Sequence, residues 1–154
     1  MTGIVQCMTS SFKVDVLSGQ MNFATAPRTI TGQDVFKIAL YSVASGADLD
    51  ATTTAYTITG EITGAGYTAG GKILTISQTP TSAGTPTTTA YINFADIAWT
   101  GATFSADGAL IYNSTNGNKS VAVLNFGSTK TVSVGTFTIT FPPAGTNSAI
   151  VQIQ

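Results

Sequence analysis

The sequence predicts a mainly β fold, a single-domain β-sandwich or jelly-roll-like fold of about seven or eight strands with one short N-terminal helix. The 154 residues have the length of one domain, and no change in composition divides 1–154 into two parts. Charged residues make up only 8% of the chain, against about 25% in an average protein. Threonine, which is β-branched and favours strands, is abundant, whereas Glu, Lys and Arg, which favour helices, are scarce.

The helix is expected over residues 9–20. Thr9 or one of the serines that follow it can cap the first turn. Phe12, Val16 and Leu17 are expected to form the apolar face that packs on the rest of the fold. Because the helix is short, it depends on that packing for its stability.

Short apolar runs separated by Gly, Pro and Asn signals predict the strands. Asn116-Gly117 predicts a hairpin turn, and Asp107-Gly108 predicts a second turn. The apolar side chains change phase between residues 90 and 100, which predicts a bulge near Asp96. The expected strands are 35–41, 56–63 (weakened by Gly60), 72–77, 90–100, 109–112, 120–126, 136–141 and 149–154; the expected loops are 45–55, 64–71, a flexible glycine-rich connection, and 79–89.

The residues available for catalysis are few. The chain has no histidine and one cysteine, Cys7, which excludes Ser-His-Asp and Cys-His catalysis, cysteine-based metal sites and an internal disulfide. We expect Cys7 to be a small buried hydrophobic residue. The seven carboxylates are scattered, and Asp48 and Asp50 supply too few oxygens for a calcium loop. We therefore expect no enzyme activity, no cofactor and no metal.

Other ligand classes also lack their signals. The glycine-rich run 64–72 has the wrong spacing for a dinucleotide site, and Lys72 is followed by isoleucine rather than by the Ser or Thr of a P-loop. The six Lys and Arg residues are dispersed and the net charge is −1, which argues against nucleic acid. We expect no membrane span and no signal peptide. Trp99 and the five tyrosines leave open a carbohydrate-binding platform, although aromatic residues on strands more often pack in the core.

Six stretches of the chain, taken in order, resemble a family of small virion structural proteins of tailed bacteriophages. The resemblance implies a structural component of the virion that is assembled in the bacterial cytoplasm, and the family has no catalytic residues to carry over. The stretches span nearly the whole chain but leave out the first ten residues and the region 79–89; they are 12–23, 34–41, 56–74, 108–113, 122–127 and 135–141.

Within that family the first expectation is a capsid decoration or cement protein. Its expected partners are the major capsid protein or other virion proteins, and it is expected to form homo-oligomers, because a surface with so little charge gives little repulsion between copies. The alternatives are a tail, neck or fibre-anchoring component and, in a different class, a carbohydrate-binding adhesion module. Residues 1–8 are expected to form a docking arm, with its contacts made by Ile4, Val5, Cys7 and Met8.

Overall fold

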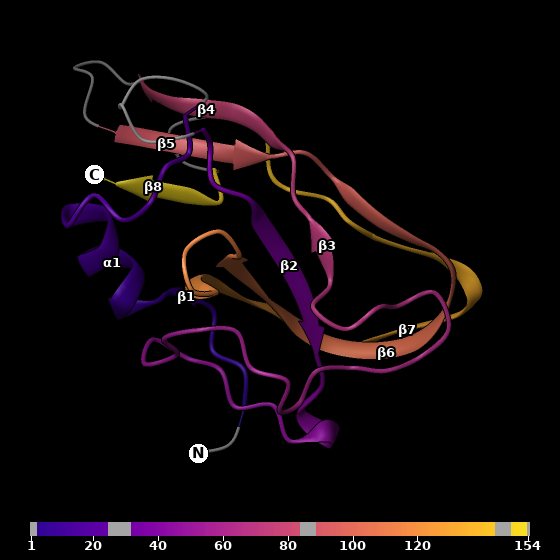
Figure 1. Ribbon diagram of the computed structural model, residues 1–154. Helices are drawn as coiled ribbons and strands as arrows, with labels where there is room; N and C mark the ends of the chain where they lie inside the picture. Colours follow the sequence, from indigo (N-terminus) through magenta and orange to yellow (C-terminus); the bar gives the residue numbers. More distant parts are fainter. Residues whose placement is uncertain (1–2, 25–31, 84–88, 144–148, 154) are drawn as a thin grey trace.

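The fold consists of two antiparallel β-sheets and one short helix, which lies beside the strand labelled β8 (Figure 1). The computed structural model describes residues 3–24, 32–83, 89–143 and 149–153. Three of the expected segments lie partly outside the described residues: residues 1–2 of the docking arm 1–8, residues 84–88 of the loop 79–89, and residue 154 of the last strand 149–154. The five-stranded sheet has the order β1-β7-β6-β2-β3 and the three-stranded sheet the order β4-β5-β8. The predicted mainly β, sandwich-like fold with a short N-terminal helix is confirmed.

The elements have the following bounds: β1 Cys7–Met8, α1 Ser10–Leu17, β2 Phe36–Tyr41, a 3-10 turn Val43–Ser45, β3 Lys72–Ile73, β4 Ile76–Ala83, β5 Thr89–Phe94, β6 Ile97–Asn113, β7 Lys119–Ile139 and β8 Val151–Ile153.

The long hairpin of β6 and β7 dominates the structure, and the predicted turn at Asn116-Gly117 joins its strands. The second predicted turn, at Asp107-Gly108, is wrong, because β6 runs through it without interruption. Gly108 lies so close to β7 that a side chain there would overlap the Leu124 carbonyl oxygen. Asp107 accepts hydrogen bonds from the Val43 N–H and the Ser42 hydroxyl, so this dipeptide fastens a neighbouring segment instead of reversing the chain.

Both strands of this hairpin bend in the half that lies away from the Asn116-Gly117 turn. Their register shifts twice between Trp99 and Phe104, and Gly101 and Val134 have positive φ of 60° and 47°. Figure 1 shows the bend at the right-hand end of the ribbon, where β6 and β7 turn from the upper to the lower layer. Bulges and bends of this kind allow strands to contribute to two packed layers.

The change of phase predicted as a bulge near Asp96 is instead a break between two strands. β5 ends at Phe94 in the three-stranded sheet, and β6 begins at Ile97 in the five-stranded sheet. The apolar side chains change sides because the chain changes sheets. Asp96 stabilises the crossing by accepting a hydrogen bond of 2.9 Å from the Phe141 N–H.

Two expectations around residues 72–89 are also corrected. The expected strand 72–77 is split, because Leu74 is buried between β3 and β4 and its N–H donates to the Phe36 carbonyl. The expected loop at 79–83 is strand: β4 continues through Pro80 to Ala83. Proline is tolerated there because β4 is an edge strand and its register shifts between Gln78 and Thr81.

The five-stranded sheet is covered on both faces. On one face a large apolar core lies against the three-stranded sheet and α1, and it includes Phe12, Phe36, Ile38, Trp99, Phe104 and Phe137. On the other face a smaller core lies beneath residues 42–71, and it includes Ile4, Tyr41, Leu49, Leu110 and Val123. Successive residues of β2 therefore point alternately into two cores, which is why this strand reads as a continuous apolar run.

The segment that covers the second core is fastened by one buried carboxylate. Glu61 accepts hydrogen bonds from the hydroxyls of Tyr56 and Tyr67, both 2.6 Å, and from the Gly70 N–H at 2.7 Å. The expected strand 56–63 is absent as a named strand, and the glycine-rich run lies against β6 at Gly64 and Gly66 and against β2 at Gly71. Gly71 has φ +68°, and a side chain there would overlap the Ile38 carbonyl of β2. Gly71 is thus required by the close approach of two backbones.

Candidate functional site: the α1–β8 groove

Of the four predicted docking residues, Ile4, Cys7 and Met8 lie against the chain's own sheet, whereas the Val5 side chain is 57% exposed. Ile4 is buried in the smaller core, and Val5 donates its N–H to the Leu49 carbonyl at 2.8 Å. Cys7 and Met8 form β1, which pairs with β7. Cys7 and Met8 are therefore an edge strand of the five-stranded sheet, and Gly3 and Val5 are hydrogen-bonded to residues 48–49. The docking role stays a prediction, but Ile4 has no surface left to offer a partner.

Cys7 packs against the smaller core as a small hydrophobic residue, but it is half-buried rather than buried as expected. Its Sγ donates to the Val5 carbonyl at 3.3 Å. Burial, and after it the negative charge of Asp50, raises the pKa of the Cys7 thiol above its ordinary value, while Lys13 opposes this. A thiol in this environment stays protonated at neutral pH and is a poor nucleophile.

Met8 borders an apolar groove that runs between the helix and the edge strands of the two sheets. The hollow has a volume of about 330 Å³, and a second hollow of about 180 Å³ continues from it along the three-stranded sheet. Figure 1 shows α1 on the side of β8 that faces away from β5. We call this feature the α1–β8 groove; it is lined by Met8, Phe12, Lys13, Val16, Leu17, Gln152 and Ile153.

Helix α1 forms where the sequence predicts it, but one residue of its predicted apolar face points away from the core. Thr9 is the N-cap, and its Oγ1 accepts a hydrogen bond from the Phe12 N–H. Phe12 is buried and Val16 is half-buried, whereas Leu17 is 89% exposed. An α-helix turns about 100° per residue, so Leu17 lies about 140° around the helix from Phe12. Leu17 therefore forms an exposed apolar rim of the groove.

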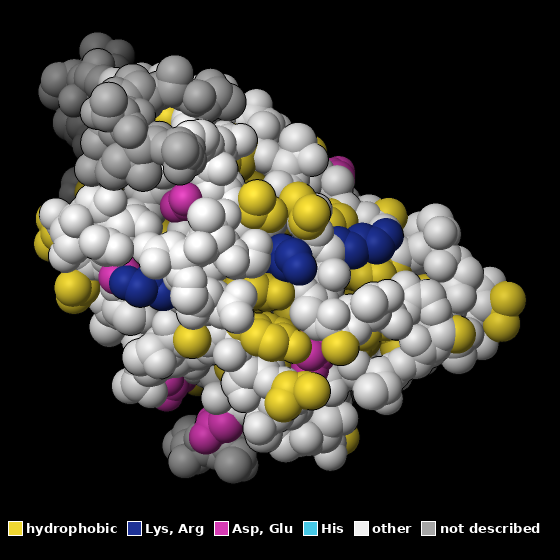
Figure 2. Space-filling view, in the orientation of Figure 1, with side chains coloured by type: hydrophobic (Ala, Val, Ile, Leu, Met, Phe, Trp, Pro, Cys, Tyr) yellow, Lys and Arg dark blue, Asp and Glu magenta, His cyan; other side chains and the backbone are white. Residues whose placement is uncertain are grey.

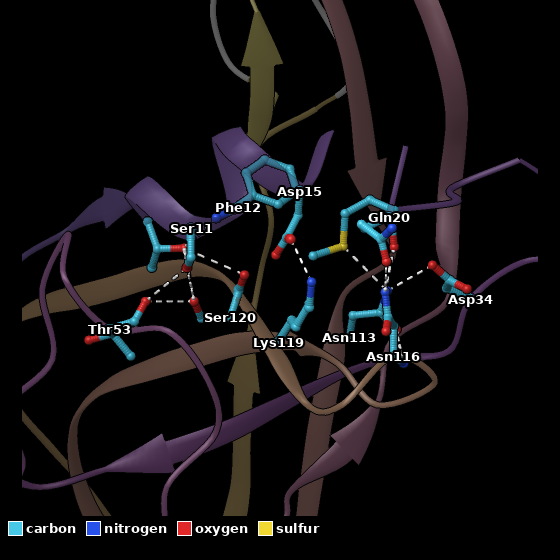
Figure 3. A network of polar contacts seen from close by, with 12 residues as sticks. Ser11, Phe12, Asp15, Gln20, Asp34, Thr53, Asn113, Asn116, Lys119 and Ser120 are labelled. Atoms are coloured by element: carbon cyan, nitrogen blue, oxygen red, sulfur yellow. Dashed lines mark hydrogen bonds and ion pairs between the residues drawn. The ribbon is translucent and has the colours of Figure 1, made fainter. Parts of the chain in front are cut away.

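A cluster of hydroxyl groups fixes the start of α1 to β7 (Figure 3). Ser120, which is fully buried, has its Oγ 2.9 Å from Thr9 Oγ1 and 3.1 Å from Ser11 Oγ. The same hydroxyl donates to the Thr53 carbonyl at 2.7 Å. A hydroxyl can both donate and accept, so these side chains join three segments of the chain at one point without any charge.

One turn further along the helix, an ion pair adds a second attachment. Lys119 Nζ is 2.6 Å from Asp15 Oδ1, and Figure 3 shows the lysine reaching from β7 to the helix. The Asp15 side chain is only 11% exposed, so this contact is screened less than a surface pair. The groove wall made by α1 is therefore held rigidly.

The segment after the helix is held in the same way by the β6–β7 turn. Asn113, which is fully buried, donates from Nδ2 to Asp34 at 2.7 Å, and its Oδ1 accepts from the Thr115 N–H. Asn116 donates to the Gln20 carbonyl at 2.9 Å. The hairpin turn that the Asn-Gly signal predicts thus also anchors the chain that leaves the helix (Figure 3).

Two polar groups of the groove have no partner in the described residues. The Lys13 ammonium makes no ion pair there, since the one ion pair that these residues contain joins Lys119 and Asp15. Gln152 Oε1 is buried and accepts no hydrogen bond. A buried acceptor without a donor is costly, so this atom marks a place where a donor would be favourable.

The seven carboxylates, by contrast, are all in use as hydrogen-bond acceptors within the chain. Their donors are backbone N–H groups, hydroxyls, an amide or one lysine. The pairs are Asp15 with Lys119, Asp34 with Asn22 and Asn113, Asp48 with Gly3, Asp50 with Thr52, Glu61 with Tyr56, Tyr67 and Gly70, Asp96 with Phe141, and Asp107 with Ser42, Val43 and Thr129. The acidic residues therefore serve to hold loops and turns in place.

The aromatic residues considered for sugar stacking are also mostly internal. Trp99 is 1% exposed and lies among Tyr67 and Phe137, with ring centroids 6.3 and 6.0 Å away. A sugar ring has no access to a buried indole, so Trp99 offers no stacking platform.

The described residues contain no group of three or more His, Cys, Asp or Glu side chains placed to hold a metal ion. Among the same residues, no helix is long and apolar enough to cross a membrane. Comparisons with known protein families, with curated proteins and with solved structures found no match to this chain.

Sequence reasoning alone did not find the groove. It named Met8, Phe12, Val16 and Leu17, but it assigned the last three to one buried helix face. The rotation of Leu17 away from Phe12 was the signal that an apolar side chain would be left outside. Gln152 and Ile153 carried no such signal, because only the pairing of β8 with β5 brings them beside α1.

Proposed function

We propose that this chain is a structural subunit of a larger protein assembly, and specifically a virion protein of a tailed bacteriophage that decorates or cements the capsid. The phage assignment is supported by the ordered resemblance of six sequence stretches. The binding role is supported by how the structure uses its polar groups: all seven carboxylates are engaged within the fold, while the α1–β8 groove stays open.

The surface chemistry fits repeated weak binding at many equivalent sites. Figure 2 shows few charged side chains, one positive and one negative of them in contact, on a face that is mainly uncharged and carries hydrophobic side chains between them. Such a surface gives little electrostatic repulsion between neighbouring copies. A subunit of this kind gains strength of attachment from the number of its contacts, and homo-oligomers around symmetry axes would add to it.

The rigid attachment of the helix supports the same role. A binding surface that is already ordered loses little conformational entropy when a partner arrives. Ser120, Lys119 and Asn116 fix α1 and the chain after it before any partner is present.

The test is co-sedimentation of the purified chain with empty capsids of the phage that encodes it. Under the proposal, binding saturates at a whole number of copies per capsid lattice position. Absence of binding, with rings or other closed oligomers formed by the chain alone, would refute the decoration role and favour a tail or neck component.

A further inference from the structure

We propose that the α1–β8 groove is the partner site, and that it takes a short, extended, apolar segment of another protein that carries a carboxylate. This inference deepens the function proposed above and rests on it for the identity of the partner. Three features of the groove define the occupant: its apolar walls, the ammonium group of Lys13 and the acceptor atom of Gln152.

The walls require an apolar side chain. Phe12 and Val16 form the inner wall, and Leu17, which is 89% exposed, stands at the rim. Ile153, on the opposite side, is 53% exposed. Leucine and isoleucine side chains with this exposure gain favourable free energy when a partner removes them from water.

Lys13 requires an anion. It is the one charged residue among those that line the groove, and it has no ion pair within the described residues. The chain's own carboxylates are already occupied by other donors. A carboxylate on the incoming segment would therefore give the site charge complementarity.

Gln152 requires an N–H donor, which selects a peptide over a lipid. A fatty acid would satisfy the apolar walls and Lys13 but would leave the buried Gln152 Oε1 without a hydrogen bond. Gln152 lines the groove, but its Oε1 is not accessible from it, so the side chain must rotate before it can accept an N–H from a peptide backbone. β8 is also an edge strand of the three-stranded sheet, and edge strands bind extended peptides through main-chain hydrogen bonds.

A second copy of the chain is a poorer occupant of the same groove. The side-chain carboxylates of the chain already accept hydrogen bonds within the fold, so a second copy would not supply the free anion that Lys13 lacks. We therefore place the homo-oligomer contacts elsewhere and assign the groove to a different protein.

The experiment uses synthetic peptides in which Val, Ile or Leu alternates with Thr and one Thr is replaced by Glu, Gln or Lys. Binding to the full chain is measured by fluorescence anisotropy. We expect the Glu peptides to bind at least about tenfold more tightly than the Lys peptides, with the Gln peptides between them. Lys13→Glu should reverse this order, and Leu17→Gln should weaken all three classes.

Two variants serve as matched controls. Lys130→Glu makes the same charge change on β7, and Ile58→Gln replaces an isoleucine that is 73% exposed and lies away from the groove. Neither should alter binding. Because Lys13 and Leu17 are exposed, their variants should unfold at the wild-type temperature, which is checked by circular dichroism. Absence of binding by every peptide class, a Glu preference that persists in Lys13→Glu, or equal losses in Ile58→Gln and Leu17→Gln would overturn the proposal.

The same variants separate this proposal from the proposed function. If the wild-type chain binds capsids and Lys13→Glu and Leu17→Gln bind them equally well, the groove proposal is refuted and the decoration role stands. If peptides bind with the predicted order but capsids do not, the groove proposal stands and the decoration role is refuted.

Discussion

Replacing Glu61 with alanine should detach the segment that covers the smaller core. The Glu61 carboxylate is the common acceptor for three donors, the hydroxyls of Tyr56 and Tyr67 at 2.6 Å and the Gly70 N–H at 2.7 Å. A hydrogen bond to a charged group contributes about 1.5–3 kcal/mol, so the sum for three has an upper range of about 4.5–9 kcal/mol. Water can reach the half-buried tyrosine hydroxyls after the substitution, and we therefore expect a loss of about 3–4 kcal/mol.

This loss is measurable by equilibrium unfolding in urea. For a chain of this size it corresponds to a fall of roughly 6–16 °C in Tm. Two milder variants report on the same site. Tyr56→Phe removes one hydrogen bond and keeps the ring stacked on Tyr112, with centroids 4.9 Å apart. Tyr67→Phe removes two, because the Tyr67 hydroxyl also accepts from the Leu40 N–H at 3.0 Å.

The expected order of destabilisation is therefore Glu61→Ala, then Tyr67→Phe, then Tyr56→Phe. A loss below about 0.5 kcal/mol for Glu61→Ala would refute the claim that this carboxylate holds the covering segment, since that is the range of an ordinary surface substitution. A larger loss for Tyr56→Phe than for Tyr67→Phe would contradict the assigned contacts.

Three further predictions concern other parts of the fold. Burial, and after it the hydrogen bond to Glu61, raises the pKa of Tyr67 above its ordinary value of about 10, so the folded state holds this proton more tightly than the unfolded state. The contribution of Tyr67 to the free energy of unfolding should therefore be fully present below about pH 10 and be lost at higher pH. Urea titrations at several pH values should show a smaller loss of stability with rising pH in Tyr67→Phe than in the wild-type chain. Gly71→Ala should lower the free energy of unfolding by about 3 kcal/mol or more, because it combines a left-handed conformation with overlap on the Ile38 carbonyl. Gly117→Ala, at φ +62° but with open space around it, should lower it by about 1–2 kcal/mol. Equal losses would contradict the close approach of Gly71 to β2. Lys119→Met should destabilise by about 1–3 kcal/mol because it leaves Asp15 buried without a cation, and adding Asp15→Asn should recover part of the loss; strictly additive losses would argue against a direct interaction.

The sequence predicted the elements whose signals are local. Thr9 capped the helix as expected, and Asn116-Gly117 formed the hairpin turn. Both depend on a few neighbouring residues, so no tertiary information was needed. The same holds for the apolar run of β2, which the structure buries on both faces.

The predictions that failed depended on contacts between distant residues. Asp107-Gly108 has the composition of a turn, but Gly108 is required by the approach of β7, and Asp107 binds residues after β2. The glycine-rich run 64–71 was predicted to be a flexible connection, because a sequence does not show which backbone will pack against its glycines. The change of phase at Asp96 was detected correctly, yet a bulge and a change of sheet leave the same pattern in the sequence.

The most direct test of the account is imaging of capsids mixed with an excess of the chain, with the symmetry of the lattice resolved. The account predicts density of one subunit at every equivalent lattice position, with α1 and β8 facing the capsid surface and a capsid segment lying between them. Capsids without added density, or subunits bound with α1 and β8 turned toward solvent, would contradict it.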